Sequence, residues 1–264
     1  MIRFNYIIPT FLLLLVLMSS CEQVIDLPLR DSDARLVIEG GITDDPGSCR
    51  VRLSRVVNYD QSNDPLLVSG ATVLLYDNGT EYTLSEVETG MYVNPQLIGI
   101  PGHEYRLVVT ADGETYSSIS KMNSKVEIDS LSFELQTFFF DTNLVTHVHF
   151  KDPAGIENYY RYRSRVRDSI SKDIQVERDV FFDGQDINQP LFGNGPRLKP
   201  GDTMFVELWG IDKGVYEYYS TLNEILGGAG PSTASPANPT SNITGGAMGY
   251  FSAFTIARKF RVVN

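Results

Sequence analysis

Apolar and polar residues alternate along the chain in short runs, and turn residues separate these runs. Leu36–Gly40, Cys49–Val57 and Ala71–Tyr76 are the first three, and Asn78-Gly79 closes the third with a pair typical of tight hairpins. Further runs follow at Glu81–Glu86, Gly90–Asn94, Glu104–Thr110 and Thr115–Ser120. Strands spaced roughly 8–12 residues apart predict an antiparallel sandwich. We therefore expect residues 35–125 to form an immunoglobulin-like β-sandwich domain.

The alternating pattern continues beyond residue 126. Its strands are expected at Leu131–Leu135, Leu144–Phe150, Asn158–Arg167, Val176–Phe182 and Thr203–Ile211. Gly249–Phe254 and Ala257–Val263 are interpreted as two terminal strands. These runs predict a second, β-rich domain over residues 126–264.

One segment has helical rather than strand periodicity. Within Lys213–Leu226, apolar and aromatic residues recur near helical spacing, and Gly227-Gly228 ends the pattern like a helix C-cap. Residues 227–246 are rich in Gly, Pro, Ser, Thr and Asn, and an irregular segment of this length is usually functional or disordered. The fold class expected is therefore mainly β, with an N-terminal sandwich, a second β-rich domain and one short helix.

The N-terminus has the pattern of an export signal. Arg3 precedes an apolar run, Ile7–Met18, which is shorter than the roughly 20 residues that span a bilayer and suits a signal peptide. The run ends in Met18-Ser19-Ser20-Cys21, which resembles the bacterial lipobox, although Leu is more usual at the position of Met18. We predict a signal peptide at residues 1–20, lipid attachment at Cys21 and a tether at residues 21–34. The alternative is an ordinary secretory signal with an incidental Cys.

The residues next to the lipidation site indicate a location. Glu22 follows Cys21 in place of an Asp of the kind that retains such lipoproteins at the inner membrane. This favours the outer membrane and leaves the leaflet open. If Cys21 carries lipid, Cys49 has no disulfide partner, and its place in an alternating run predicts a buried strand residue.

The charge of the chain argues against nucleic acid as a partner. The formal net charge is −11, whereas phosphate backbones require a clustered positive field. The densest basic run has Arg161, Arg163, Arg165 and Arg167 at alternate positions. We interpret it as the solvated face of a strand.

Candidate chemistry is sparse. The sequence has no phosphate-binding loop and no nucleophile elbow, so we predict no catalytic residue, no metal and no cofactor. Two alternatives stay open: His147 and His149 share one face of a strand, and the Asp183–Asp186 loop has carboxylates suited to calcium. Aromatic residues at 138–140 and 159–162 are interpreted as core, with a ligand surface as the alternative.

Two segments resemble a known family. Leu36–Asp44, followed by Val51–Ser54 and Gly70–Val73, is similar to the start of a large Bacteroidota lipoprotein family, domain of unknown function 4249. Ala237–Ala253 resembles that family's most recognisable segment. The matching residues there form a possible partner or ligand loop: Asn238, Pro239, Asn242, Gly245, Gly246 and Gly249. The structural alternative is that the glycines permit positive φ and the Asn side chains bond loop backbone.

The resemblance implies an outer-membrane lipoprotein encoded beside TonB-dependent receptors. The function we expect is a non-enzymatic accessory that is held in the membrane by its lipid and helps such a receptor capture or admit its substrate. A surface adhesin or structural envelope component is the alternative. A hydrolase acting on glycans or peptides is a third. The sequence leaves the ligand and the oligomeric state open.

Overall fold

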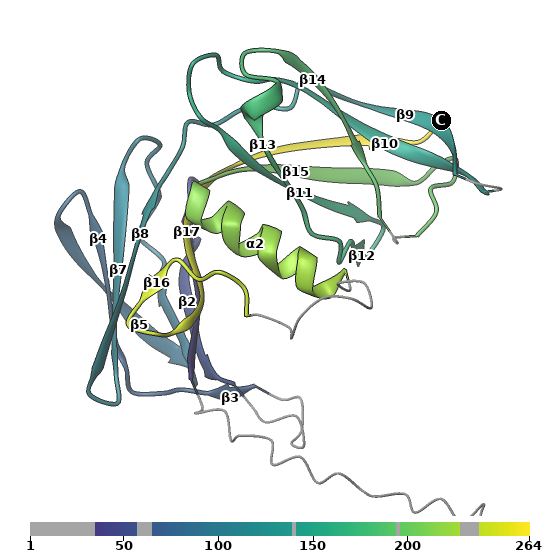
Figure 1. Ribbon diagram of the computed structural model, residues 1–264. Helices are drawn as coiled ribbons and strands as arrows, with labels where there is room; N and C mark the ends of the chain where they lie inside the picture. The colour runs from purple at the N-terminus through teal and green to yellow at the C-terminus, as the bar shows by residue number, and fades with distance from the viewer. Residues whose placement is uncertain (1–34, 57–64, 139–140, 194–195, 228–237) are drawn as a thin grey trace, which may run out of the picture. The chain divides into compact units, whose positions relative to one another are not determined.

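The computed structural model describes residues 35–56, 65–138, 141–193, 196–227 and 238–264 (Figure 1). The predicted signal peptide, Cys21 and the tether therefore lie outside the described residues. Fourteen of the described strands form one continuous hydrogen-bonded sheet that folds back on itself. Two facing parts of it, here called the two sheets of the N-terminal sandwich, contain the first strands of the chain. The first sheet consists of β1 (Leu36–Thr43), β2 (Cys49–Arg55), β3 (Leu66–Leu67), β6 (Met91–Asn94) and part of β17 (Met248–Val262). The second consists of β4 (Thr72–Asp77), β5 (Thr80–Glu88), β7 (Glu104–Ala111), β8 (Glu114–Lys121) and β16 (Ile243–Thr244).

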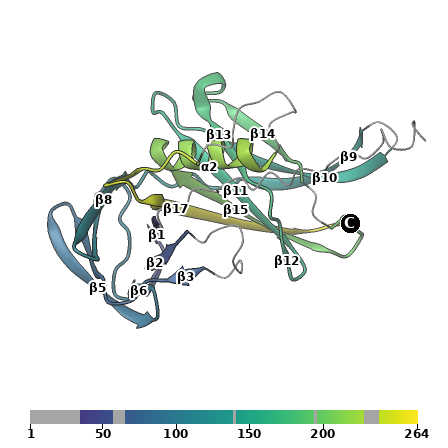
Figure 2. The same ribbon diagram turned by 60° about the horizontal axis from the view of Figure 1, so that its bottom comes forward.

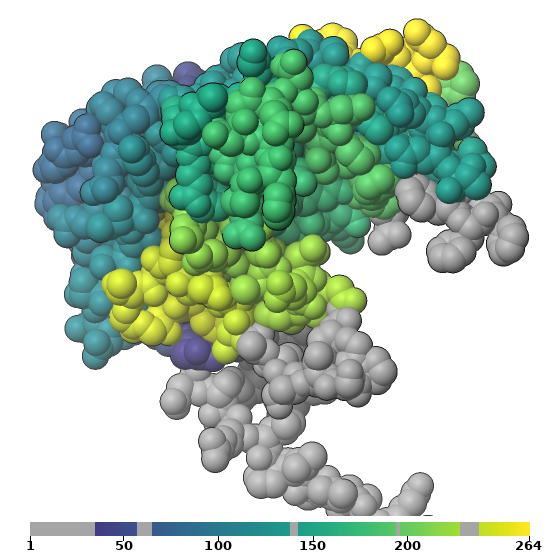
Figure 3. All heavy atoms as spheres, turned by 45° about the horizontal axis from the view of Figure 1, so that its top comes forward, coloured from purple at the N-terminus to yellow at the C-terminus, as the bar shows by residue number. Residues whose placement is uncertain are grey.

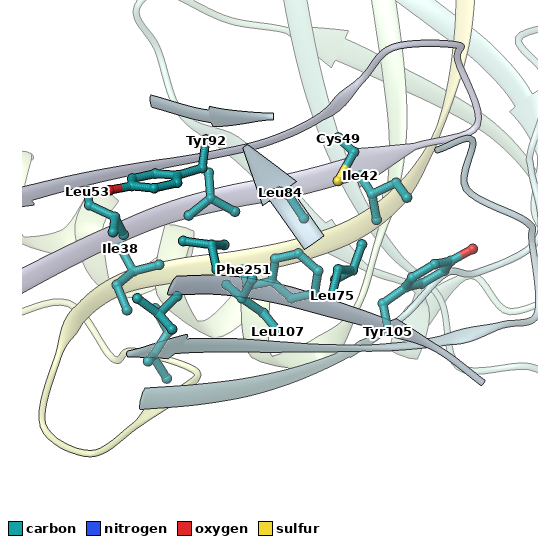
Figure 4. Close-up of a cluster of buried hydrophobic side chains, with 14 of the residues drawn as sticks. Ile38, Ile42, Cys49, Leu53, Leu75, Leu84, Tyr92, Tyr105, Leu107 and Phe251 are labelled. Atoms are coloured by element: carbon teal, nitrogen blue, oxygen red, sulfur yellow. The ribbon is translucent and has the colours of Figure 1, made fainter. Parts of the chain in front are cut away.

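The alternating pattern accounts for the core of the N-terminal sandwich. Ile38 and Leu53 from one sheet meet Leu75 and Leu107 from the other, and each is at most 1% exposed. Phe251 of β17 joins the same cluster (Figure 4). Side chains at every second position of a strand point to one face, so these residues bury apolar area between the sheets. The expected sandwich-like arrangement is thus present.

The other end of the continuous sheet and a separate three-stranded sheet, here together called the C-terminal sandwich, enclose a second core. One consists of β11 (Tyr159–Val166), β12 (Ser169–Ile170), β13 (Gln175–Arg178), β15 (Thr203–Ile211) and the rest of β17. We call it the arginine sheet, after Arg161, Arg163 and Arg165 on β11. The other consists of β9 (Ser130–Phe138), β10 (Asp141–Lys151) and β14 (Asp186–Leu191), and a short 3₁₀ turn, Asp179–Phe181, follows β13.

Helix α2 (Lys213–Leu226) has the predicted bounds. Its Val215 and Tyr219 pack with Ile211 and Phe254 on the face of the arginine sheet opposite the second core. The mainly β fold with a short helix in this segment is therefore confirmed. Figure 2 shows α2 lying along this sheet.

Strand β17 corrects the prediction of two terminal strands. It is continuous over 15 residues, Met248–Val262. Its first half runs parallel to β1, from the pair Val37–Met248 to the pair Thr43–Phe254, and its second half runs antiparallel to β15. The prediction separated the two strands at Thr255 and Ile256, but these residues pair with Gly210 and Trp209 of β15, so backbone pairing is continuous.

Pairing by β16 and β17 also crosses the domain boundary predicted at residue 125. Ile243 pairs with Ser118 of β8, so C-terminal strands contribute to both sheets of the N-terminal sandwich. By their contacts, residues 33–264 form one unit. Local pattern could not reveal these pairs, because the partners are more than a hundred residues apart in sequence.

A glycine allows β17 to lie against β1. Gly249 has a φ of +94°, and a Cβ built there would overlap the carbonyl oxygen of Ile38. Only glycine combines this backbone conformation with so close an approach. Gly246 also has a positive φ, +85°, but has open space where a Cβ would lie.

A buried polar cluster joins three elements where the two sandwiches meet. The Ser120 hydroxyl of β8 donates a hydrogen bond to Asp212 and accepts one from the Ala253 amide of β17 at 2.8 Å. Asp212 is also the N-cap of α2 and accepts from the Val215 amide at 2.9 Å. Burial raises the pKa of Asp212, although its hydrogen bonds act in the opposite direction.

Replacing Gly249 with Ala should destabilise the fold by about 3 kcal/mol or more, because strain at positive φ adds to the overlap with Ile38. Gly246→Ala, which brings only the backbone strain, should cost about 1 kcal/mol. Urea unfolding measures both. Equal losses for the two variants would contradict the close approach of β17 to β1.

The raised pKa of Asp212 gives a signed pH dependence. The folded state binds this proton more tightly than the unfolded state, so stability falls as pH rises from the unfolded value through the folded pKa. Asp212→Asn keeps a good N-cap and removes the titration. The free energy of unfolding of the original chain minus that of the variant should therefore decrease between about pH 3 and pH 7. Asp168→Asn, at an exposed aspartate, is the matched control, and a difference that rises with pH would contradict the assignment.

Candidate functional site

A cleft of about 520 Å³ lies where the first sheet of the N-terminal sandwich meets the arginine sheet. Its walls come from β1, β2, β11, β15 and β17, and it includes Trp209, the single tryptophan of the chain. Glu39 and Arg50 contribute from one side, and Arg163 and Glu207 from the other. This volume lies in the range of about 300–1,000 Å³ that is typical of ligand sites.

Strand alternation aligns the functional side chains of the arginine sheet. Met204, Val206 and Leu208 of β15 point into the second core, so Phe205, Glu207 and Trp209 point to the face that α2 partly covers. On β11 they lie opposite Arg165, Arg163 and Arg161, respectively. The result is a ladder of arginines beside two aromatic rings and a carboxylate.

The arginines of this ladder pack on aromatic faces. The Arg161 guanidinium lies 3.8 Å from the ring centroid of Tyr219 and 4.8 Å from that of Trp209. Arg163 lies 5.0 Å from the Trp209 ring, and Arg165 lies 4.2 Å from the Phe205 ring. Such contacts are attractive because a cation meets the negative face of the ring.

The prediction that the basic run is a solvated face is wrong for Arg161. Its guanidinium lies under α2, donates to the Tyr219 hydroxyl at 2.8 Å and has a pKa lowered mainly by burial. Arg165 and Arg167 are exposed as expected. Tyr219 of the helix that covers Arg161 is 58 residues further along the chain, so the local pattern did not indicate it.

Glu207 holds the polar side of the cleft together. It accepts from the Trp209 indole nitrogen at 3.0 Å and from Arg258 Nε at 3.1 Å, and it lies 3.7 Å from Arg163. Arg258 also forms a bidentate pair with Asp45 at 3.1 and 2.5 Å. The hydrogen bond from Arg258 lowers the pKa of Asp45. Both carboxylates are therefore held close to cationic donors.

A second hollow of about 420 Å³ continues along the same face. It shares Arg163, Glu207 and Arg258 with the cleft and adds Phe205 and Phe260, whose ring centroids are 5.7 Å apart. We call the cleft and this hollow together the sheet groove. One half of the sheet groove is charged and the other is largely apolar.

The predicted partner or ligand loop lies at the edge of the N-terminal sandwich, beside α2 (Figure 3). Asn242 pairs with the backbone of Phe251: its amide nitrogen donates to the carbonyl at 2.8 Å, and its oxygen accepts from the amide at 3.0 Å. A Cβ on Gly245 would lie 3.0 Å from Thr115 O. Contact with a partner stays a prediction for this loop, and the structure supplies a structural reason for Asn242, Gly245 and Gly249.

Asn238, Pro239 and Gly246 differ from those residues. Asn238 and Gly246 are exposed, and Pro239 is half-buried. Among the described hydrogen bonds, the one nearest in sequence to Asn238 and Pro239 joins the Thr240 amide to the Thr221 hydroxyl of α2 at 2.9 Å. Gly245 is exposed as well, so the exposed residues among those predicted are Asn238, Gly245 and Gly246.

The structure contains one cluster of carboxylates that the sequence did not predict. Asp183, in the loop considered for calcium, lies with Asp152 and Asp179, so that one oxygen of each is within 4.8 Å of the others. Asp152 accepts from the Tyr160 hydroxyl and from the Gly184 amide, and burial raises the pKa of Asp179. Within the described ranges, this is the set with three side chains close enough to hold a divalent cation. Asp179 and Asp183 lie in one connection between strands, but Asp152 follows β10, so the spacing in the sequence gave no signal.

The two histidines are held by neighbouring polar side chains. His147 contacts Asn188 at 2.7 Å and Gln136 at 2.9 Å, and His149 contacts Ser132 at 2.7 Å. Within the described part of the chain, neither belongs to a group of three metal-ligating residues. These contacts are typical of a polar sheet face.

The aromatic and cysteine predictions have separate outcomes. Tyr160 and Tyr162 lie in the second core, as the core interpretation expected. Phe139, Phe140 and the side chain of Phe138 lie outside the described residues.

Cys49 is 1% exposed within the N-terminal sandwich, so the prediction of a buried strand residue is confirmed.

Fold and site together define a mainly β protein with a sandwich-like N-terminal part and a groove formed across its sheets. The sequence matches the model of one family, described as Domain of unknown function (DUF4249), over residues 22–259. The chain belongs to this family. A search of curated proteins found no match. Within the described ranges, no helix has the length and apolar character needed to cross a membrane.

Burial makes Cys49 chemically inert in the folded protein. Desolvation raises the pKa of its thiol to about 12, and the thiolate is the reactive form. In a Cys21→Ala variant, a disulfide reagent at pH 8 should label no thiol in the native state and one thiol per chain after unfolding. Adding Ser85→Cys at an exposed strand position provides a thiol that should react at once. Rapid native labelling without that addition would contradict the buried environment.

Proposed function

We propose that the chain is a lipid-anchored, non-enzymatic protein of the outer membrane that captures the substrate of a TonB-dependent receptor. The observation that carries this proposal is the sheet groove. Its cleft is lined by residues of β1 and β17, the strands that contain the two segments on which the family resemblance rests. A ligand-sized groove at this place supports a role in binding.

The pairing of the cleft carboxylates with an arginine supports ligand binding rather than proton transfer in catalysis. In the cleft, Asp45 and Glu207 are both paired with Arg258, and the pKa of Asp45 is lowered. A general acid in hydrolysis needs a raised pKa so that it carries a proton near neutral pH. Two carboxylates that pair with one arginine are better suited to fixing the side chains that line the groove.

The membrane anchor rests on the sequence. The lipobox-like Met18-Ser19-Ser20-Cys21 ends the apolar run, and the family match begins at residue 22, directly after Cys21. Several acyl chains at about 0.8 kcal/mol per buried methylene hold a protein stably in a membrane. Such a tether raises the effective concentration of the protein near a membrane partner. The same proposal places the anchor in the outer membrane and the chain in a lipoprotein family of Bacteroidota.

Co-purification tests the receptor partner. The TonB-dependent receptor encoded beside the gene, carrying an affinity tag, is isolated from detergent-solubilised membranes, and this chain should accompany it. An unrelated lipoprotein of the same membrane is the control and should be absent. Repeated recovery of the receptor without this chain would overturn the receptor partnership.

Cys21→Ala tests the tether. The variant should lose membrane retention and should fail to restore substrate uptake to a deletion strain, while its unfolding curve stays unchanged. Full restoration of uptake by soluble Cys21→Ala protein would show that tethering is not required. A deletion that impairs attachment or envelope integrity and leaves uptake intact would favour the adhesin or structural alternative.

A further inference from the structure

We propose that the sheet groove binds an extended peptide that carries acidic and large apolar side chains. The inference names a ligand class for the groove and therefore rests on the substrate-capture part of the proposed function. Three features carry it: the charge of the cleft, the apolar half of the groove, and the open edge of β17.

The cleft is cationic although the chain is acidic. Arg50, Arg52, Arg163 and Arg258 face three carboxylates in it, whereas the whole chain has a formal net charge of −11. Arg52 lies 3.8 Å from Glu39 and Arg258 is fully engaged, but Arg50 is exposed and has no ion pair among the described residues. Arg163 has one ion pair among the described residues, the 3.7 Å contact with Glu207, and its guanidinium also lies 5.0 Å from the Trp209 ring. Arginine forks bind carboxylates strongly, so Arg50 and Arg163 are the residues that can receive acidic side chains.

The other half of the groove requires apolar groups. Phe260 is 66% exposed and Ile170 is 53% exposed, and both line the hollow beside Phe205. Covering this surface releases water from apolar area, which a leucine or phenylalanine side chain would do. An acidic glycan would satisfy the arginines and leave this half uncovered. The combination therefore favours a peptide.

The edge of β17 supplies backbone partners. β1 pairs with β17 only as far as the pair Thr43–Phe254, and the chain then turns away. There the Asp44 side chain accepts from the Ile256 amide at 2.9 Å. Beyond this point, β17 pairs only with β15 among the described strands. An extended peptide can add to such an edge through main-chain hydrogen bonds, with its side chains in neighbouring pockets.

The edge is also cationic. Arg258 and Lys259 are followed there by Phe260, Arg261 and Val262. Arg258 pairs with Asp45 and Glu207, and Arg261 donates to the Leu131 carbonyl, so Lys259 is the cation of this stretch that has no ion pair among the described residues. Charges on an edge strand discourage pairing with copies of the same chain, whereas an acidic peptide would be attracted. The positive charge of the edge and that of the cleft therefore both favour an acidic peptide.

Trp209 provides the readout. It is the single tryptophan and lines the cleft, so a ligand there should change its emission. The mature chain with Cys21→Ala is titrated with a blocked heptapeptide that has Asp at positions 1 and 3, Leu at positions 5 and 7 and Ser between them. In an extended peptide these acidic and apolar side chains share one face, and calorimetry measures the same binding. Replacing Asp with Lys, or Leu with Ser, should each weaken binding by about tenfold or more. The same titration with polygalacturonate tests the alternative ligand, an acidic glycan.

Two variants locate the site. Arg163→Gln removes a cation from both halves of the groove, and Phe260→Ser removes an exposed ring from the apolar half. Each should raise the Kd for the Asp–Leu peptide by about tenfold. The matched controls, Arg106→Gln and Phe181→Ser, change exposed residues that do not line the groove and should leave the Kd unchanged.

The outcomes separate this inference from the receptor proposal. No calorimetric binding of the Asp–Leu peptide, equal affinity in both groove variants, or tighter binding of polygalacturonate would each overturn the peptide assignment. If co-purification with the receptor succeeds while the titration fails, only the peptide assignment is lost. If the titration succeeds and co-purification fails, the groove binds peptides without that receptor.

Discussion

The close approach of Gly249 to the carbonyl of Ile38 is the constraint on which the rest of the structure depends. It lets the last long strand lie parallel to the first, and the same strand then continues into the arginine sheet. A side chain at Gly249 would separate β1 from β17, and the two sandwiches would lose their shared strand. Ser120 and Asp212 act at the same junction, because they join β8, the start of α2 and β17 through buried hydrogen bonds.

The shared strand also shapes the sheet groove. The cleft spans the point where β1 leaves β17: Glu39 and Tyr250 of the paired stretch line it together with Arg258, which lies beyond the last pair. Gly41 contributes to its depth: it lines the cleft and has no side chain, and a Cβ there would lie 3.1 Å from Ser252 O. One turn of the chain, at Asp44 and Asp45, thus determines where the pairing of β1 with β17 ends and which carboxylate receives Arg258.

The chemistry of the groove follows from strand alternation within a covered sheet. Residues of β11 and β15 alternate between the second core and the α2 face, so arginines and aromatic rings accumulate on that face. Since α2 covers only part of it, Arg161 is enclosed between Trp209 and Tyr219, while Arg163 remains in the groove. The same side-chain type therefore has a structural role at one position and is available for binding two residues later.

The sequence by itself determined most of the longer strands, the helix at residues 213–226 and the burial of Cys49, because each depends on local periodicity or on capping residues. It did not predict β14, and it extended a strand through Asp179–Phe181, where the chain forms a 3₁₀ turn. Only the tertiary structure decided which strands pair, since hydrogen bonds between β1 and β17 or between β8 and β16 leave no local pattern. The candidate site divides in the same way. The Arg ladder and the glycine-rich loop were visible as motifs, but the groove, the carboxylates of Asp152, Asp179 and Asp183, and the internal bonds of Asn242 required segments distant in sequence to meet. Periodicity reports which face of an element is buried, whereas only packing decides what that face is buried against.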